Sequence, residues 1–213
     1  MCSPMPPSNT WVVKLGGAML EAAELPQWLA ACSASAPHAP RCVLVAGGGG
    51  LADRVRALQA RWRFDDRLAH ELALDTMRLN ARLLQGLAPS LPLCEATHGA
   101  ELMSAPTGAL IWRPPALFAP PALPACWAVT SDSVALWLAQ ALAASGLLLV
   151  KSLSPAELRA DSANAWAAAG VVDSYFPQLL AAAWLPVRLI SKLQVMDFAS
   201  GLRDGVLPGV TVS

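Results

Sequence analysis

Two short apolar runs that end in glycine are the residues whose types and spacing best fit a chemical site. Residues 11–15 precede a glycine pair, and residues 42–46 precede a run of four glycines at 47–50. Because glycine has no Cβ, the backbone can turn sharply there and bring its N–H groups close to a ligand. Such turns bind phosphate oxygens. Lys14 adds a positive charge beside the first turn, so the pattern predicts a phosphate site.

The second glycine run opens directly into a predicted helix over residues 51–63, whose positive N-terminal end adds to the preference for anions. Two other interpretations stay open. Each glycine turn alone is also typical of a tight structural connection, and Gly47-x-Gly49-x-x-Ala52 matches the loose form of the dinucleotide fingerprint. A dinucleotide site needs a further strand that ends in an acidic residue about twenty positions on. The chain has the polar stretch 61–67 there instead.

Four further polar residues lie beside predicted strands or on predicted helices. Ser131 and Asp132 precede a strongly apolar helix, where capping of that helix is the structural alternative to a ligand contact. Lys151 follows the predicted strand 147–150, and open α/β sheets bind ligands at the carboxyl ends of their strands. His70 lies on the less charged face of a long helix, where both a packing role and a functional role are open.

The elements that position these residues alternate between strand and helix. Apolar runs predict strands at 11–15, 42–46, 91–96, 109–112, 147–150, 186–190 and 210–212. Helical spacing predicts helices at 24–35, 51–63, 66–87, from 133 onward, 156–168, 175–184 and 192–202. Five prolines between residues 113 and 124 predict a loop. Strand–helix–strand units favour parallel pairing, so we expect an α/β fold with a largely parallel sheet and helices on both faces.

Composition excludes some classes of function. The 213 residues carry 15 basic and 15 acidic side chains, with no basic run, so we expect no nucleic-acid partner. The longest apolar run, 133–150, is interrupted by Gln140, Ser145 and Gly146. It fits a buried helix, a turn and a core strand better than a membrane span, so we expect no membrane association.

The cysteines and the N-terminal residues indicate the compartment and the domain organisation. Five scattered cysteines with no CxxC spacing fit reduced thiols rather than disulfides or a zinc site, which predicts a cytoplasmic protein without a resident metal. Residues 1–10 contain three prolines and lack the features of a signal peptide, so we expect a loose tail. Residues 11–213 are expected to form a single domain.

Three segments together resemble the amino acid kinase family, which includes acetylglutamate, aspartate, uridylate and isopentenyl phosphate kinases. They are VVKLGG at 12–17, VLVAGGGGLADRVR at 43–56 and WAVTSDSVALWLA at 127–139. The resemblance extends over residues 11–213. It implies the three-layer αβα sandwich of the amino acid kinase, or carbamate kinase-like, fold. It also implies transfer of a phosphoryl group from ATP, with Mg²⁺ accompanying the nucleotide.

Within this family the chain looks most like the aminomethylfuranylmethyl phosphate kinases of methanofuran biosynthesis. The residues that carry this narrower resemblance are His70, Ala73 and Met77, the phrase WAVTSDS, and residues 172–177. The implied reaction converts the phosphate of 5-(aminomethyl)-3-furanmethanol into its diphosphate. The apolar composition and eight tryptophans also favour a homo-oligomer.

The resemblance assigns a role to each candidate site residue. Lys14 bridges the reacting phosphates and Asp132 orients the lysines, as the catalytic pair. His70 and Met77 face the acceptor. The residues that bind phosphate or nucleotide are Gly16, Gly17, Gly47, Gly48, Gly49, Ser131, Lys151 and Asp173.

The chain departs from the family pattern on the nucleotide side. Residues 150–155 lack the two acidic residues of the usual nucleotide loop, and no glycine-methionine phrase with a second phosphate-binding lysine follows. Lys151 and Lys192 are the candidates for that second charge. Two alternatives therefore stand beside the kinase of phosphomonoesters: a non-catalytic member that binds nucleotide or another anion, and a kinase of the same fold that acts on a carboxylate or another phosphate.

Overall fold

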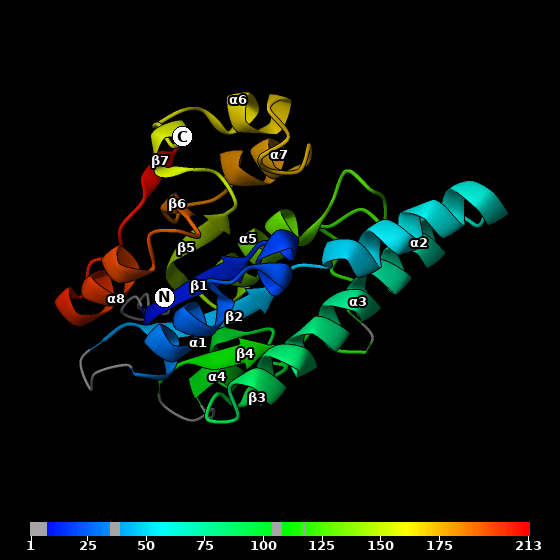
Figure 1. Ribbon diagram of the computed structural model, residues 1–213. Coiled ribbons are helices and arrows are strands. Elements are labelled where there is room, and N and C mark those ends of the chain that lie inside the picture. The colour runs from blue at the N-terminus through cyan, green and yellow to red at the C-terminus, as the bar shows by residue number, and fades with distance from the viewer. Residues whose placement is uncertain (1–7, 35–38, 104–107, 117) are drawn as a thin grey trace, which may run out of the picture.

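A seven-stranded sheet runs through the middle of the molecule (Figure 1). The computed structural model describes residues 8–34, 39–103, 108–116 and 118–213. The strand order is β3-β4-β2-β1-β5-β6-β7, and every neighbouring pair is parallel except β6 and β7. The strands are β1 (Ser8–Leu15), β2 (Arg41–Ala46), β3 (Leu93–Cys94), β4 (Leu110–Trp112), β5 (Ala144–Lys151), β6 (Val187–Ser191) and β7 (Val210–Val212).

The three central strands are buried on both faces. Val13 of β1 lies in register with Leu44 of β2 and with Leu148 of β5, and all three side chains are buried. Continuous apolar runs of this kind are typical of parallel strands that helices cover from both sides. Because the strands are parallel, the carboxyl ends of β1, β2 and β5 meet at one edge of the sheet. Both glycine turns therefore lie at that edge.

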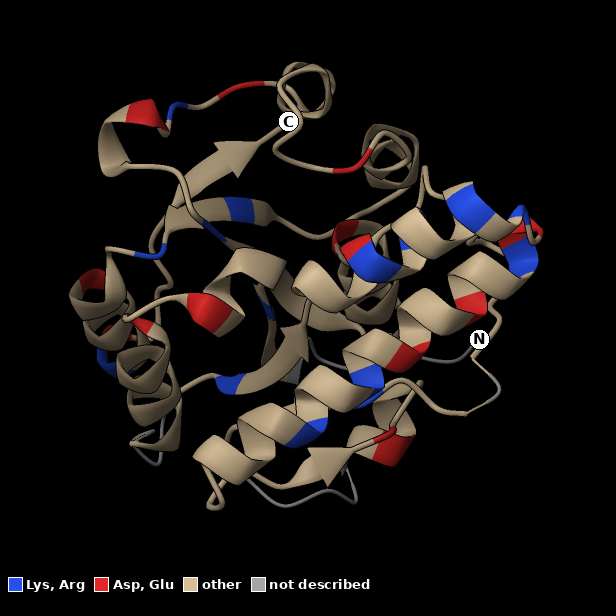
Figure 2. Cartoon of the chain, turned by 45° about the vertical axis from the view of Figure 1, so that its right-hand side comes forward, with Lys and Arg blue, Asp and Glu red and all other residues tan. Residues whose placement is uncertain are grey.

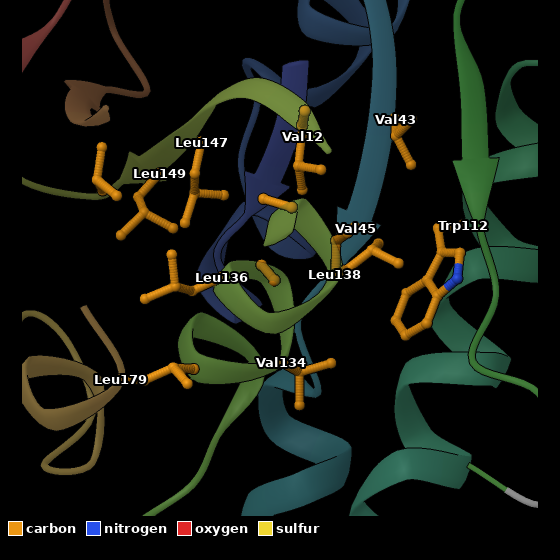
Figure 3. Packing of buried hydrophobic residues seen from close by; sticks show 14 of the residues in the cluster. Val12, Val43, Val45, Trp112, Val134, Leu136, Leu138, Leu147, Leu149 and Leu179 are labelled. Atoms are coloured by element: carbon orange, nitrogen blue, oxygen red, sulfur yellow. The ribbon is translucent and has the colours of Figure 1, made fainter. Parts of the chain in front are cut away.

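Helices form a layer on each face of the sheet. On one face, α1 (Leu25–Ser33) and α8 (Val195–Asp204) pack through residues such as Trp28 and Phe198, whose ring centroids are 4.7 Å apart. On the other face, α5 (Ser131–Ala141), α6 (Ala163–Ala168) and α7 (Phe176–Ala181) form the layer. Leu136 and Leu138 of α5 pack there with apolar side chains of the central strands, as Figure 3 shows. The expected three-layer architecture is thus confirmed.

Two long helices extend from the sheet beside the glycine turns. They are α2 (Gly49–Trp62) and α3 (Asp66–Leu87), which pack against each other (Figure 1). The turn between them forms because Arg63 adopts the left-handed conformation at the end of α2 and the Asp65 side chain caps α3. In Figure 2 basic and acidic residues are interspersed along these two helices. His70 and Met77 both belong to α3, which places them next to the glycine turns.

Several predicted boundaries were wrong. β1 begins at Ser8, which pairs with Ala144, so residues 8–10 belong to the sheet rather than to a tail; residues 1–7 lie outside the described residues. The predicted helix 156–168 is a short 3₁₀ turn (Pro155–Glu157) followed by α6, because Asp161 bridges to Val212 and Ser162 caps the helix. A 3₁₀ turn (Gly17–Glu21) and α4 (Gly99–Met103) were not predicted.

α8 begins three residues later than predicted, at Val195. A backbone hydrogen bond from Gln194 to Ser191 closes a turn between β6 and the helix, so Lys192 lies in this turn rather than in α8. The apolar run 133–150 forms most of α5 and β5, as its interruptions predicted. Of the helices in the described part of the chain, none combines the length and the apolar character needed to cross a bilayer.

Candidate active site

The two glycine turns touch each other at the carboxyl edge of the sheet. A methyl group on Gly17 would lie 2.6 Å from the backbone N and Cα of Gly49, which itself has a φ of +57°. Any side chain at either position would therefore force the turns apart or strain the backbone. The close contact explains why both positions are glycine, and it leaves backbone rather than side chains lining this part of the edge.

Asn80 of α3 holds the second glycine turn in place. Its amide nitrogen donates hydrogen bonds to the carbonyl oxygens of Gly47 (2.7 Å) and Gly48 (3.0 Å), and the residue is buried. These two bonds fix the second turn to α3. Asn80 was not among the predicted site residues. A buried amide on an apolar helix face was the available signal, since such a group needs partners.

Two of the predicted N–H donors are already used inside the protein. The N–H of Gly47 donates to the carbonyl oxygen of Leu15 (2.9 Å), and the N–H of Gly16 donates to that of Val150 (3.3 Å). These bonds continue the sheet by one residue and join the first turn to the end of β5. The assignment of Gly16 and Gly47 as phosphate donors is therefore corrected: they fix the turns rather than face a ligand.

Lys14, Asp132 and Lys151 form a buried ionic cluster beside the turns. Oδ1 of Asp132 lies 2.8 Å from Nζ of Lys14 and 2.8 Å from Nζ of Lys151. Successive side chains of β1 point to opposite faces of the sheet, and this brings Lys14 to Asp132. Val13 and Leu15 face α1 and α8, while Lys14 faces α5, whose first turn carries Asp132. The three side chains are 5%, 7% and 11% exposed in the order Lys14, Asp132, Lys151. Of the two candidates for a second charge, Lys151 lies in this cluster and Lys192 does not.

The electrostatics of this cluster favour an anion. Burial alone would raise the pKa of Asp132, but the charges and hydrogen bonds of Lys14 and Lys151 outweigh it and hold the pKa at about 2. Burial lowers the pKa of Lys151 to about 8; Asp132 opposes this shift and Lys14 adds to it. Two ammonium groups pair with the one carboxylate of Asp132, and Asp173, which is occupied by its own hydrogen bonds, acts on Lys151 through its charge without an ion pair. A phosphate bound beside the cluster would add negative charge that stabilises both ammonium groups.

Asp173 secures the helix start that carries Asp132. Its carboxylate accepts hydrogen bonds from the N–H and hydroxyl of Thr130, the N–H and hydroxyl of Ser133, and the N–H of Phe176, at 2.6 to 3.0 Å. Burial raises the pKa of Asp173, the nearby charge of Asp132 adds to this, and the hydrogen bonds oppose it. Asp173 is therefore a positioning residue for α5. This replaces the direct nucleotide contact that the resemblance implied.

A cavity of about 250 Å³ opens beside the glycine turns. Its apolar wall includes Leu74, Trp127 and Val129, and the guanidinium of Arg56 lies 4.3 Å from the ring centroid of Trp127. Burial lowers the pKa of His70, with Glu71 opposing, so the imidazole is neutral near pH 7. The structure brings together in this wall six of the predicted site residues: Gly17, Gly48, Gly49, His70, Met77 and Ser131.

The acidic residues at the site do not form a metal-binding site. Asp132 is engaged by two lysines and Asp173 by five protein donors, and among the residues described no group of three potential metal ligands is present. This arrangement does not fit a metal ion held by the protein itself. A cation that entered with a nucleotide would have to take its ligands from the phosphates and water.

Comparisons with known proteins agree with this geometry. A profile of the amino acid kinase family matches residues 9–154, whereas a search among curated proteins found no significant match. The uridylate kinase of Archaeoglobus fulgidus is similar in structure, with a TM-score of 0.69 and 14% identity over 96% of this chain and 100% of that one. The UMP kinase of Ureaplasma parvum gives a TM-score of 0.67 and 15% identity over 96% and 98%.

A longer protein shares the same fold over part of its length. The aspartate kinase of Synechocystis has a TM-score of 0.62 and 16% identity, and the match covers 95% of this chain but 39% of that enzyme. These structural likenesses agree with the architecture described above. Because the family profile covers more than half of its length, the chain belongs to the amino acid kinase family and is a kinase-type phosphotransferase.

Proposed function

We propose that the chain transfers the γ-phosphoryl group of ATP to a small phosphomonoester bound in the 250 Å³ cavity, which yields a diphosphate. The observation that carries the proposal is the buried cluster of Lys14, Asp132 and Lys151, in which two ammonium groups pair with one carboxylate next to that cavity. Phosphoryl transfer depends mainly on alignment and on neutralisation of the phosphate charges. The cluster and the glycine turns supply both.

Each residue of the cluster has a distinct part in the transfer. Lys14 lies on β1, between the acceptor cavity and the donor side at β5. There its ammonium group can contact the transferred phosphoryl group. Lys151 lies on β5 and neutralises charge on the donor side. Asp132, which stays ionised because its pKa is about 2, holds both ammonium groups in place. Lys14 and Lys151 therefore need little reorganisation when the phosphates bind, which is the main requirement for electrostatic catalysis.

The absence of a general base from this scheme favours an acceptor that is already anionic. A phosphate monoester has its second pKa near 6, so at neutral pH its attacking oxygen carries negative charge and needs no base. A hydroxyl acceptor would need one. Among the described residues of the cavity wall, the groups that could accept a proton are Asp53, which pairs with Arg56 at 2.9 Å, and the half-buried His70. We assign the neutral His70 to orienting the acceptor rather than to proton abstraction. A carboxylate acceptor meets the same requirement and is the second candidate.

Among phosphomonoesters we propose 5-(aminomethyl)-3-furanmethanol phosphate, in the synthesis of a methanofuran-type cofactor. The resemblance at His70, Ala73 and Met77 supports this choice, and the apolar wall with Leu74 and Trp127 suits a flat ring. UMP is the alternative acceptor suggested by the names of the uridylate kinases with the same fold.

A panel of acceptors tests the proposal. Purified protein is incubated with ATP, Mg²⁺ and each of the furanmethanol phosphate, UMP, isopentenyl phosphate, aspartate and acetylglutamate, and ³¹P NMR follows the new diphosphate or acyl phosphate. We expect a new diphosphate signal with the furanmethanol phosphate and none from the Lys14→Met control. Calorimetric binding of ATP without a product from any acceptor would instead indicate the non-catalytic alternative.

The homo-oligomer and the cytoplasmic location remain predictions. Apolar residues exposed on the outer side of α3 are consistent with a subunit contact: Leu68, Leu79, Leu83 and Leu87. Light scattering coupled to size-exclusion chromatography measures the mass in solution, and a monomer at every concentration would contradict the oligomer.

A further inference from the structure

The distribution of lysines in this chain is unusual. The 15 basic residues comprise twelve arginines and only three lysines, Lys14, Lys151 and Lys192. All three lie at the carboxyl edge of the sheet: Lys14 near the end of β1, Lys151 as the last residue of β5, and Lys192 directly after β6. These strands are consecutive in the sheet, as Figure 1 shows. Elsewhere the chain uses arginine as its basic residue.

The backbone of Lys192 is fixed beside that of Lys151. The N–H of Lys192 donates to the carbonyl oxygen of Lys151 (2.8 Å), and the indole N–H of Trp28 donates to the carbonyl oxygen of Lys192 (2.8 Å). Adjacent strands are about 4.8 Å apart, so the three lysines are distributed over about 10 Å along the edge. Lys14 and Lys151 face α5, whereas Lys192 is held against α1 on the other face. A ligand above the edge would thus have cations on both sides.

Lys192 is held more loosely than the other two lysines. Its Nζ lies 3.3 Å from Oε2 of Glu24, the residue before α1, and these side chains are 26% and 23% exposed. Oε2 of Glu24 is a buried atom for which the described residues provide no hydrogen bond, so charge attraction at 3.3 Å is what holds Lys192 there. Lysine carries a compact charge on a flexible stem, which suits movement between two partners better than the rigid fork of arginine.

We infer that Lys192 is a third phosphate-binding cation, which binds the non-transferred phosphates of the donor nucleotide, and that Glu24 holds it when the site contains no nucleotide. The inference rests on the proposed function for the identity of the donor. It explains how this chain could bind a triphosphate although residues 150–155 lack the acidic nucleotide loop of the family. The ligand class is a nucleoside di- or triphosphate, recognised through its phosphate chain.

Binding of ATP, ADP and AMP, measured by calorimetry with Mg²⁺ at constant salt, tests this role without any acceptor. In Lys192→Met we expect the affinity for ATP to fall by about tenfold, as for loss of a charged hydrogen bond, and the affinity for AMP to change little. In Glu24→Gln we expect ATP to bind about threefold more tightly, because the competing carboxylate is gone. Arg203→Met, in the last turn of α8, removes the same charge far from the edge and should change nothing.

Equal losses for ATP and AMP, or no loss for ATP in Lys192→Met, would overturn the inference. If that variant fails to fold, Glu24→Gln decides, since unchanged or weaker ATP binding there excludes a competition between Glu24 and phosphate. The outcomes separate the two proposals. Lys192-dependent ATP binding without turnover of any acceptor would refute the proposed function alone, and normal turnover with ATP binding independent of Lys192 would refute this inference alone.

Discussion

The two sides of the candidate site are built in different ways. On the β1–β2 side, backbone contact defines the site: Gly17 touches Gly49, and the amide of Asn80 fixes the second turn. On the β5–β6 side, lysine side chains define the site, and few acidic residues lie near them. One half of the site therefore depends on the shape of the backbone, and the other half depends on the charge of the lysine side chains. Substitutions, pH and salt should therefore affect the two halves in different ways.

Removal of the shared carboxylate is the largest expected effect on the charged side. Asp132→Asn would remove the carboxylate that pairs with both buried ammonium groups, and breaking a buried ion pair in this way destabilises a protein by about 3 kcal/mol or more. Urea denaturation measures the loss. Millimolar phosphate should restore part of the stability, because an anion that binds the folded state takes the place of the carboxylate. Stability equal to that of the unmodified protein would argue against a charged cluster.

Lys14→Ala should reduce turnover by about two orders of magnitude or more, because it removes a charge that contacts the transferred group in the transition state. The acceptor KM should change less than kcat, since the cavity wall does not contain Lys14. Steady-state kinetics separates the two parameters. Turnover that survives unchanged would remove Lys14 from the proposed chemistry.

On the shape side, Gly17→Ala places a methyl group 2.6 Å from the backbone of Gly49 and should push the glycine turns apart. We expect a loss of about 2 kcal/mol in the free energy of unfolding, as for overpacking elsewhere, together with weaker acceptor binding. Gly86→Ala is the matched control, because a methyl group there meets nothing within 4 Å inside α3. It should stabilise the protein by about 0.5 to 1 kcal/mol. Similar effects from both substitutions would contradict the contact between the turns.

The smallest effect is expected from pH. Lys151 has a folded pKa of about 8 against 10.5 for the free side chain, so between these values the unfolded chain holds the proton that the folded chain has lost. From this group alone, folding therefore becomes more favourable as pH rises through that window. Phosphate binding should respond oppositely, because a neutral Lys151 attracts anions less.

Calorimetry at pH 9 in buffers of different ionisation enthalpy can detect this coupling. We expect ATP binding to take up as much as one proton, and Lys151→Met to abolish the uptake. The shape side should contribute nothing to it, since the glycine turns carry no titratable group. Uptake that persists in the variant would assign the proton to another residue.

Sequence reasoning found the parts of the site that depend on local pattern. The apolar runs with terminal glycines, Lys14 and the start of α5 follow from residue type and spacing, and the structure places them together. The role of Asn80, which was missed, and that of Asp173, which was assigned to nucleotide binding, depend on contacts between distant segments. Asn80 reaches the glycine turn across more than 30 residues, and Asp173 caps a helix from 40 residues away. No spacing along the chain encodes such contacts.

The same limit explains the errors in hydrogen-bond assignment and in helix boundaries. The N–H groups of Gly16 and Gly47 were predicted to face phosphate, but the sheet continues through them. The alanine-rich stretch that predicted a helix from residue 156 instead includes a bridge to β7 at Asp161. In both cases a backbone partner from another strand overrides the local preference.

The concentration of lysine at one edge also determines how the protein reacts with amine reagents. Acylating reagents attack the neutral form of an amine, and of the three lysines Lys151 has a pKa lowered to about 8 while Lys192 is the most exposed. Any acetylated lysine found by peptide mass mapping therefore reports on the carboxyl edge of the sheet and on no other surface. Conversely, attachment of the protein to a sensor through lysine amines would block the very edge whose ligands are to be measured.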